Sequence, residues 1–144
     1  MSIEENKTIF HGVMDQAFSQ GNIAALGRLM SPDFIEHEAG PGQGRGLEGV
    51  KTIVAMARTA FPDLHATIED MTAEGDKTWA RVTFRGSNTG DFMGRLPTGK
   101  TVTYEAIDIC RYANGKMVEH WGVVDMLGMM QQLGIVSPPG PNGS

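Results

Sequence analysis

The sequence lacks the features typical of secreted, membrane-spanning and nucleic-acid-binding proteins. Cys110 is the only cysteine in 144 residues, which excludes an intrachain disulfide and a cysteine-based metal cluster. The N-terminus is polar and acidic rather than a signal peptide, and no apolar run approaches the roughly 20 residues of a membrane span. The net charge is −5, and no basic run is present to neutralise phosphates. We therefore expect a cytoplasmic protein that binds neither nucleic acid nor membranes.

The chain has the length and composition of one globular domain. It is 40% hydrophobic and 20% charged, both ordinary values. No internal repeat is visible. The last eight residues, SPPGPNGS, contain nothing to bury. We therefore predict a single domain over residues 1–136 and a flexible tail over residues 137–144.

Apolar residues in the first part of the chain recur at helical spacing. The pattern predicts a helix over residues 3–20, a short one over 23–30 and a third over 47–61, where Pro62 ends it. A short strand over residues 34–38 is expected between the second and third helices. The glycine-rich segment 40–46 is expected to be a loop over the mouth of a pocket.

After Pro62 the hydrophobic period changes from about 3.6 residues to 2, which is typical of strands. Asn114-Gly115 is a strong hairpin signal between the last two strands. The predicted strands cover residues 65–71, 78–85, 101–112 and 116–125, and a final helix covers 126–133. Helices followed by antiparallel strands indicate an α+β fold. We expect three to four helices on a curved antiparallel sheet, forming a cone that encloses a ligand pocket.

The hairpin predicts which side chains share a face. With a two-residue turn, Cys110 would oppose Glu119 and Asp108 would oppose Trp121. One face would then carry aromatic and acidic groups, as a functional pocket requires, whereas the other would carry His120 among aliphatic residues. In the alternative, the acidic face is in solvent and the aliphatic face packs on the helices. A bulge would also let His120 and Asp125 share a cavity.

The order of short motifs resembles the SnoaL-like polyketide cyclases, a family of the nuclear-transport-factor-2-like superfamily of α+β cones. The most specific motif is the string from Gly115 to Asp125, GKMVEHWGVVD, followed by Met126-Leu127 and Gln132-Leu133-Gly134. Weaker matches occur at residues 34–37, 46–49, 61–64, 75–77, 86–90, 92–94 and 97–100, so the resemblance spans about Lys7 to Gly134. One departure is Gly86-Ser87-Asn88-Thr89-Gly90, which lacks the histidine found in many members.

The resemblance implies a reaction and a catalytic residue. In the family's cyclases, an aspartate at the end of the last strand is the acid/base of an intramolecular aldol condensation, and Asp125 occupies that position. The resemblance also implies an aromatic polyketide ester as substrate, no cofactor, no metal, and a homo-oligomer such as a dimer or tetramer. The competing interpretation of Asp125 is an N-cap for the final helix.

Other candidate residues come from the chemistry of their side chains. His120 and His37 could hold or relay a proton, although a strand histidine is more often structural. The remaining candidates would bind substrate: Trp121, Tyr104, Asp108, Phe34 and Phe92. Aromatic residues at these positions would otherwise be ordinary core. No histidine spacing typical of a metal site occurs, and we expect none.

Two other functions fit the same pattern. A non-catalytic module of this fold would bind apolar small molecules without changing them. A hydrolase of epoxides or similar electrophiles would use the pocket acids to activate water. Fold does not decide among the three.

Overall fold

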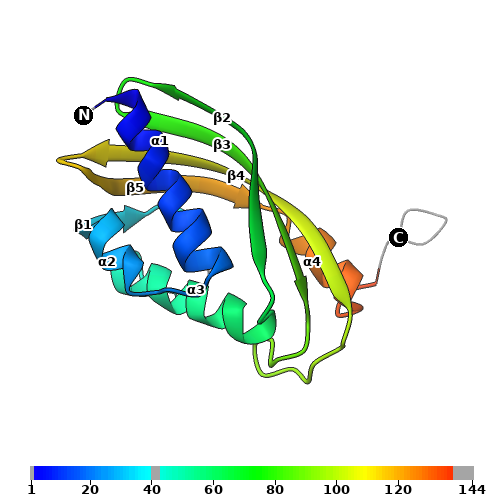
Figure 1. Cartoon of the computed structure of the whole chain (residues 1–144). Helices are drawn as coiled ribbons and strands as arrows, with labels where there is room; N and C mark the ends of the chain where they lie inside the picture. Colours follow the sequence, from blue (N-terminus) through cyan, green and yellow to red (C-terminus); the bar gives the residue numbers. More distant parts are fainter. Residues whose placement is uncertain (1, 40–42, 138–144) are drawn as a thin grey trace.

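The computed structural model describes residues 2–39 and 43–137 and confirms the α+β fold class. Within these residues, four helices pack on a five-stranded sheet with the strand order β1-β5-β4-β3-β2 (Figure 1). The sheet is mixed and does not close into a barrel. Most of the predicted tail, residues 138–144, and the centre of the predicted loop, residues 40–42, lie outside the described residues.

The first predicted helix is present but changes type halfway. Helix α1 covers Ile3–Gly12, and the chain continues as the π-helical segment η1 over Val13–Ser19. The Ser2 hydroxyl accepts a hydrogen bond from the Glu5 N–H at 3.0 Å and caps the N-terminus. The apolar stripe is buried against the sheet, which is what its period predicts.

Two further helices follow on the same side of the sheet (Figure 1). Helix α2 covers Ala25–Leu29 and α3 covers Leu47–Ala60. Helix α3 ends two residues before Pro62, since the residue preceding a proline is disfavoured in helical conformation. None of the helices in the described part of the chain is long and apolar enough to cross a bilayer.

Four strands form the antiparallel part of the sheet: β2 (His65–Glu74), β3 (Lys77–Ser87), β4 (Thr101–Ala113) and β5 (Lys116–Val124). Asn114 and Gly115 both have positive φ, 52° and 77°. A type I′ hairpin turn requires this backbone conformation at both central residues, which confirms the predicted turn.

The expectation of a purely antiparallel sheet is wrong at one edge. Strand β1 (Met30–Glu36) pairs in parallel with β5, and its register places Glu36 beside His120. Parallel neighbours need a long connection between them, and here the connection contains α3 and the strands β2, β3 and β4. This edge carries the polar residues of the candidate site.

The predicted hairpin register is also wrong by one residue. Tyr112 pairs with Met117 as expected, but Arg111 pairs with Glu119 and Cys110 pairs with His120. Val118 is the extra residue of a β-bulge at this point. As a result, His120 shares the inner face with Asp108, and Trp121 shares the outer face with Ile109.

The inner face of the sheet packs against the helices. Along β3 and β4 the even-numbered residues face inward; Val82, Val102, Ala106 and Cys110 are at most 2% exposed. Ile107 therefore points outward, and it is 47% exposed. Val124 pairs with the inward-facing Ala106 but lies at the end of β5, where it is 40% exposed. Helix α4 (Met126–Leu133) lies beside the start of β4 and buries Met129 and Leu133 (Figure 1).

Candidate functional site

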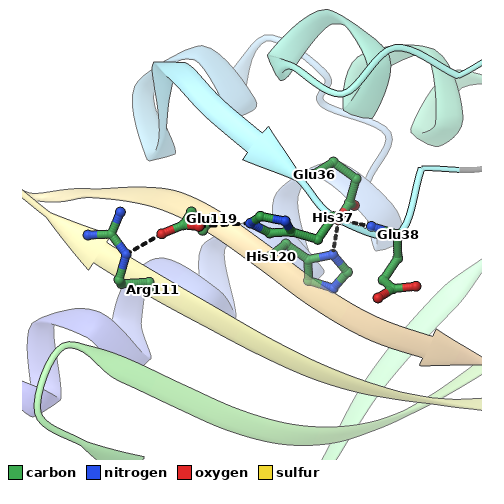
Figure 2. Close-up of polar contacts among 6 residues, drawn as sticks. All are labelled: Glu36, His37, Glu38, Arg111, Glu119 and His120. Atoms are coloured by element: carbon green, nitrogen blue, oxygen red, sulfur yellow. Dashed lines mark hydrogen bonds and ion pairs between the residues drawn. The ribbon is translucent and has the colours of Figure 1, made fainter.

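His120 lies between two carboxylates on the inner side of the sheet. Its Nδ1 lies 2.5 Å from Glu36 Oε2, and its Nε2 lies 2.7 Å from Asp108 Oδ1. The side chains of Glu36 and Asp108 are only 12% and 9% exposed, and that of His120 is 20% exposed. We call these three residues the inner cluster. Its His120–Glu36 contact is drawn in Figure 2.

The pKa of His120 reflects two opposed effects. Burial lowers it, because the interior disfavours the charged imidazolium. The hydrogen bonds to Asp108 and Glu36, together with their negative charges, more than reverse this and raise the pKa to about 9. At neutral pH His120 is therefore an imidazolium that donates to both carboxylates.

Three strands assemble the inner cluster. Parallel pairing of β1 with β5 sets Glu36 against His120, and antiparallel pairing sets Asp108 of β4 opposite Gly122 of β5. Gly122 is essential to this arrangement. A Cβ atom at Gly122 would lie 2.8 Å from His120 Nε2 and 2.9 Å from Asp108 Oδ1. The absent side chain leaves the space in which the two groups meet.

A second polar group lies on the outer face of the same strands. His37 Nε2 is 2.8 Å from Glu119 Oε2, and the Arg111 guanidinium pairs with the same carboxylate (Figure 2). The pKa of Glu119 is lowered by hydrogen bonds from His37 and Arg111. The His37 ring stacks on Trp121 with 4.7 Å between centroids. The structure therefore separates His37 and Trp121 from His120, although all three were predicted to serve one pocket.

Asp125 lies at the junction of β5 and α4 and caps that helix. Its Oδ1 accepts a hydrogen bond from the Gly128 N–H at 2.9 Å. Although apolar residues flank it in the sequence, Asp125 is exposed, as are Val123, Val124, Met126 and Leu127. Asp125 lies five residue steps beyond His120, about 17 Å along a strand. The two predicted acid/base residues therefore do not meet.

The predicted aromatic side chains occupy three surroundings. Phe34 is 3% exposed and belongs to the core. Tyr104 stacks on Phe84 with 5.3 Å between centroids, and burial raises its pKa to about 12. Phe92 packs near Phe61 and lines a cavity between the loop after β3 and the end of α4.

Sequence reasoning brought Asp108 and His120 forward but missed two members of the site. Glu36 was not among the predicted site residues, because its partner depends on a parallel pairing that no local pattern reveals. Gly122 was not among the predicted site residues either. Its position two residues after a histidine, in mid-strand where glycine is unfavourable, was the available signal. Among residues 2–39 and 43–137, no three His, Cys, Asp or Glu side chains are placed to hold a metal ion.

The fold agrees with the comparisons with known proteins. Aklanonic acid methyl ester cyclase DauD of Streptomyces sp. (strain C5) is 29% identical over 111 residues, which are 76% of this chain and 66%, just under two thirds, of that protein. TsrD from Streptomyces laurentii has a TM-score of 0.85 at 27% identity, covering 94% of this chain and 99% of that one. IdmH from Streptomyces antibioticus has a TM-score of 0.78 at 32% identity, covering 90% and 98%. The model of the SnoaL-like polyketide cyclases matches residues 8–133, and the chain therefore belongs to that family.

Proposed function

We propose that this protein is a cofactor-independent cyclase that closes a ring in a small hydrophobic ester of polyketide type by intramolecular aldol condensation. The observation that carries the proposal is the inner cluster, a half-buried imidazolium held between two buried carboxylates in a member of a cyclase family. Four relatives are named methyl ester cyclases, of aklanonic or nogalonic acid. A methyl ester of an aromatic polyketide acid is accordingly the proposed substrate class.

An aldol ring closure needs two proton transfers at neighbouring atoms. In the proposed mechanism the Asp108 carboxylate takes the proton from the carbon alpha to one carbonyl, and that carbon bonds to a second carbonyl carbon. The new alkoxide then takes the proton back from Asp108, so the product is an isomer of unchanged mass. His120 supplies the positive charge that holds Asp108 oriented and stabilises negative charge as it develops.

Asp125 remains the acid/base candidate that the family motif supports, but the structure favours its role as a helix cap. The two transfers occur within a few ångströms of each other, whereas Asp125 and His120 are about 17 Å apart along β5. Only one of the two places can therefore be the reaction centre. The burial and bridging contacts of the inner cluster favour Asp108 and His120.

The test is turnover of aromatic polyketide methyl esters, followed by chromatography and mass measurement. We expect an isomeric product with wild type, and a loss of 100-fold or more in Asp108→Asn and His120→Gln, as is typical for a lost proton-transfer group. Asp125→Asn is the matched acid-to-amide control and is expected to keep most activity. The reverse pattern, loss in Asp125→Asn alone, would move the reaction centre to the β5–α4 junction.

Two other outcomes would replace the proposal with the functions left open by the sequence. Binding of the ester without conversion in any variant would indicate a non-catalytic binding module. Uptake of one oxygen-18 atom from labelled water would indicate a hydrolase, because an aldol product gains no oxygen.

The outer face of the sheet supports the proposal of a homodimer. Trp79, Ile109 and Trp121 lie in one cross-strand row, and Ile107 and Val123 lie in the next. Ile107 is 47% and Val123 73% exposed, so this outer apolar patch is not covered by the described part of the chain. Exposed apolar patches that include tryptophan are typical of protein interfaces.

The charges around the outer apolar patch suit a second copy of the chain. Arg81 pairs with Asp70 at 2.8 Å and lies 3.7 Å from Glu105, and Arg111 pairs with Glu119. The rim is therefore nearly neutral although the chain carries −5. A symmetric dimer requires a self-complementary surface, which a balanced rim provides.

A cytoplasmic location stays a prediction from the sequence.

A further inference from the structure

A cavity lies at the end of the molecule opposite the β4–β5 turn, between the loop that follows β3 and the C-terminal end of α4. Its volume is about 440 Å³, within the range of roughly 300–1,000 Å³ common for small-molecule sites. Two sets of side chains line it: the polar Asn88, Arg95 and Thr98, and the apolar Phe92, Leu96, Leu133 and Ile135. Gly134 completes the wall.

The loop that forms one wall of this cavity is held in place by Asn88. The buried Asn88 amide donates to the carbonyls of Ala60 and Gly90 at 3.1 and 2.9 Å, and its Oδ1 accepts from both the N–H and the hydroxyl of Thr98. A Cβ atom at Gly90 would lie 1.8 Å from the Thr59 carbonyl oxygen, so the loop touches the backbone of α3. The cavity is therefore preformed, which reduces the entropy lost when a ligand binds.

This fixed loop holds apolar side chains in solvent. Phe92 and Arg95 exchange backbone hydrogen bonds, which closes a tight turn between them. Next to it, Leu96 is 87% exposed and Met93 63% exposed. Neither side chain belongs to the core, whereas the neighbouring Phe92 packs toward Phe61. Exposed apolar groups beside a preformed cavity are available to cover an apolar ligand.

The cavity also has an excess of positive charge at its edge. The Arg95 side chain lines it, and Lys100 Nζ lies 3.1 Å from where a Gly134 side chain would begin. Neither cation forms an ion pair within residues 2–39 and 43–137. The nearby carboxylate of Asp91 accepts from the Gly94 N–H at 3.0 Å within the turn. An anionic group on a ligand would give Arg95 a partner.

We propose that this cavity binds an amphipathic anion, a flat apolar body that carries one carboxylate or sulfonate group. The apolar side chains would cover the body, and Arg95 would pair with the anion. The cavity borders the start of β4, and Asp108, seven residues after Thr101, lies about 23 Å further along that strand. It is therefore a second ligand site, distinct from the inner cluster, and its existence does not depend on the proposed reaction.

The test compares an anionic and an uncharged probe with similar rings. Fluorescence titration with 8-anilinonaphthalene-1-sulfonate and with neutral N-phenyl-1-naphthylamine should show saturable binding of both to the wild-type chain. Arg95→Gln should weaken binding of the sulfonate about tenfold, the size expected for one charge-assisted hydrogen bond. The same variant should leave binding of the neutral probe unchanged, which also shows that the cavity is intact.

The control is Arg85→Gln, which removes an exposed arginine from β3 outside the cavity lining. It should change neither affinity. Amide chemical shifts of Asn88 and Gly134 should move on titration with the sulfonate. The proposal is overturned if Arg95→Gln leaves the ratio of the two affinities unchanged, or if the shifts instead cluster around Ile107 and Val123. Turnover is not measured, so failure here is distinct from failure of the cyclase assignment.

Discussion

His120 is the residue whose surroundings differ most from what its position on a strand suggests. Burial alone would favour the neutral imidazole, but Asp108 and Glu36 accept from its two nitrogens and raise its pKa to about 9. A histidine with an ordinary pKa near 6.5 titrates around neutrality, whereas this one stays charged there. Its folded-state pKa therefore exceeds its unfolded-state value, and folding is linked to proton binding.

This linkage predicts how stability changes with pH. The contribution of His120 is fully present below pH 6.5 and is lost as pH rises through about 9, because only the folded state holds the proton in that window. We expect the free energy of unfolding of wild type to fall between pH 6.5 and 9 by up to about 3 kcal/mol more than that of His120→Gln. Urea denaturation of both proteins at several pH values measures the difference.

Gly122→Ala provides an independent version of the same experiment. Its Cβ would stand 2.8 Å from the His120 ring and 2.9 Å from Asp108, so the contact between them must open. The pH dependence should then approach that of His120→Gln. Gly27→Ala is the matched control, since nothing lies within 4 Å of its Cβ position. Equal pH dependence in wild type and Gly122→Ala would show that the Asp108 contact does not set the pKa.

At the scale of elements, Asp125 at the start of α4 has two possible roles, as the cap of the helix and as a charged group. Asp125 caps the helix through the Gly128 N–H, and asparagine caps about as well as aspartate. We expect Asp125→Ala to lower the free energy of unfolding by about 1 kcal/mol and Asp125→Asn to change it by a few tenths. Urea denaturation checks both variants. If Asn costs as much as Ala, the carboxylate charge stabilises the fold by something other than the cap.

Elements that depend on local signals could be predicted from the sequence. Helix α4 begins and ends where predicted, and the Asn114-Gly115 turn has the positive φ values it requires. The π-helical segment η1 and the parallel placement of β1 could not be predicted in this way. The placement of β1 depends on pairing with β5, which is distant in sequence, so no local pattern predicts it. Nothing in the local sequence of η1 distinguishes it from an ordinary amphipathic helix.

The candidate site shows why one residue of register matters. The bulge at Val118 moved His120 to the inner face and Trp121 to the outer face, the reverse of the predicted arrangement. Side chains alternate along a strand, so a single extra residue exchanges the faces of all that follow. Residue types indicated the chemistry, with Asp108 and His120 among the candidates. Which of them meet depended on a bulge and a strand pairing that the sequence does not reveal.

The whole molecule has two unequal sides. One side of the sheet is covered by α1, α2 and α3, and the opposite side carries the outer apolar patch (Figure 1). A folded monomer gains nothing from leaving Ile107 and Val123 exposed beside the half-buried row of Trp79, Ile109 and Trp121. The same strands carry both sides, because His120 faces inward where Glu119 and Trp121 face outward. A partner on the outer face would therefore lie against the strands that hold the inner cluster.

A charge placed in the outer apolar patch tests this arrangement. Val123, 73% exposed and paired with Ile107, is replaced by glutamate, so a symmetric dimer would bury two like charges close together. Light scattering coupled to size-exclusion chromatography should give a dimer for wild type and a monomer for Val123→Glu. Thr52→Glu, an exposed position on α3 on the other side of the sheet, adds the same charge and should remain dimeric. A wild-type monomer would contradict the proposed dimer, and a Val123→Glu dimer would place its interface on another surface. If the dimer dissociates and the pKa of His120 falls with it, the partner also helps to hold the inner cluster in place.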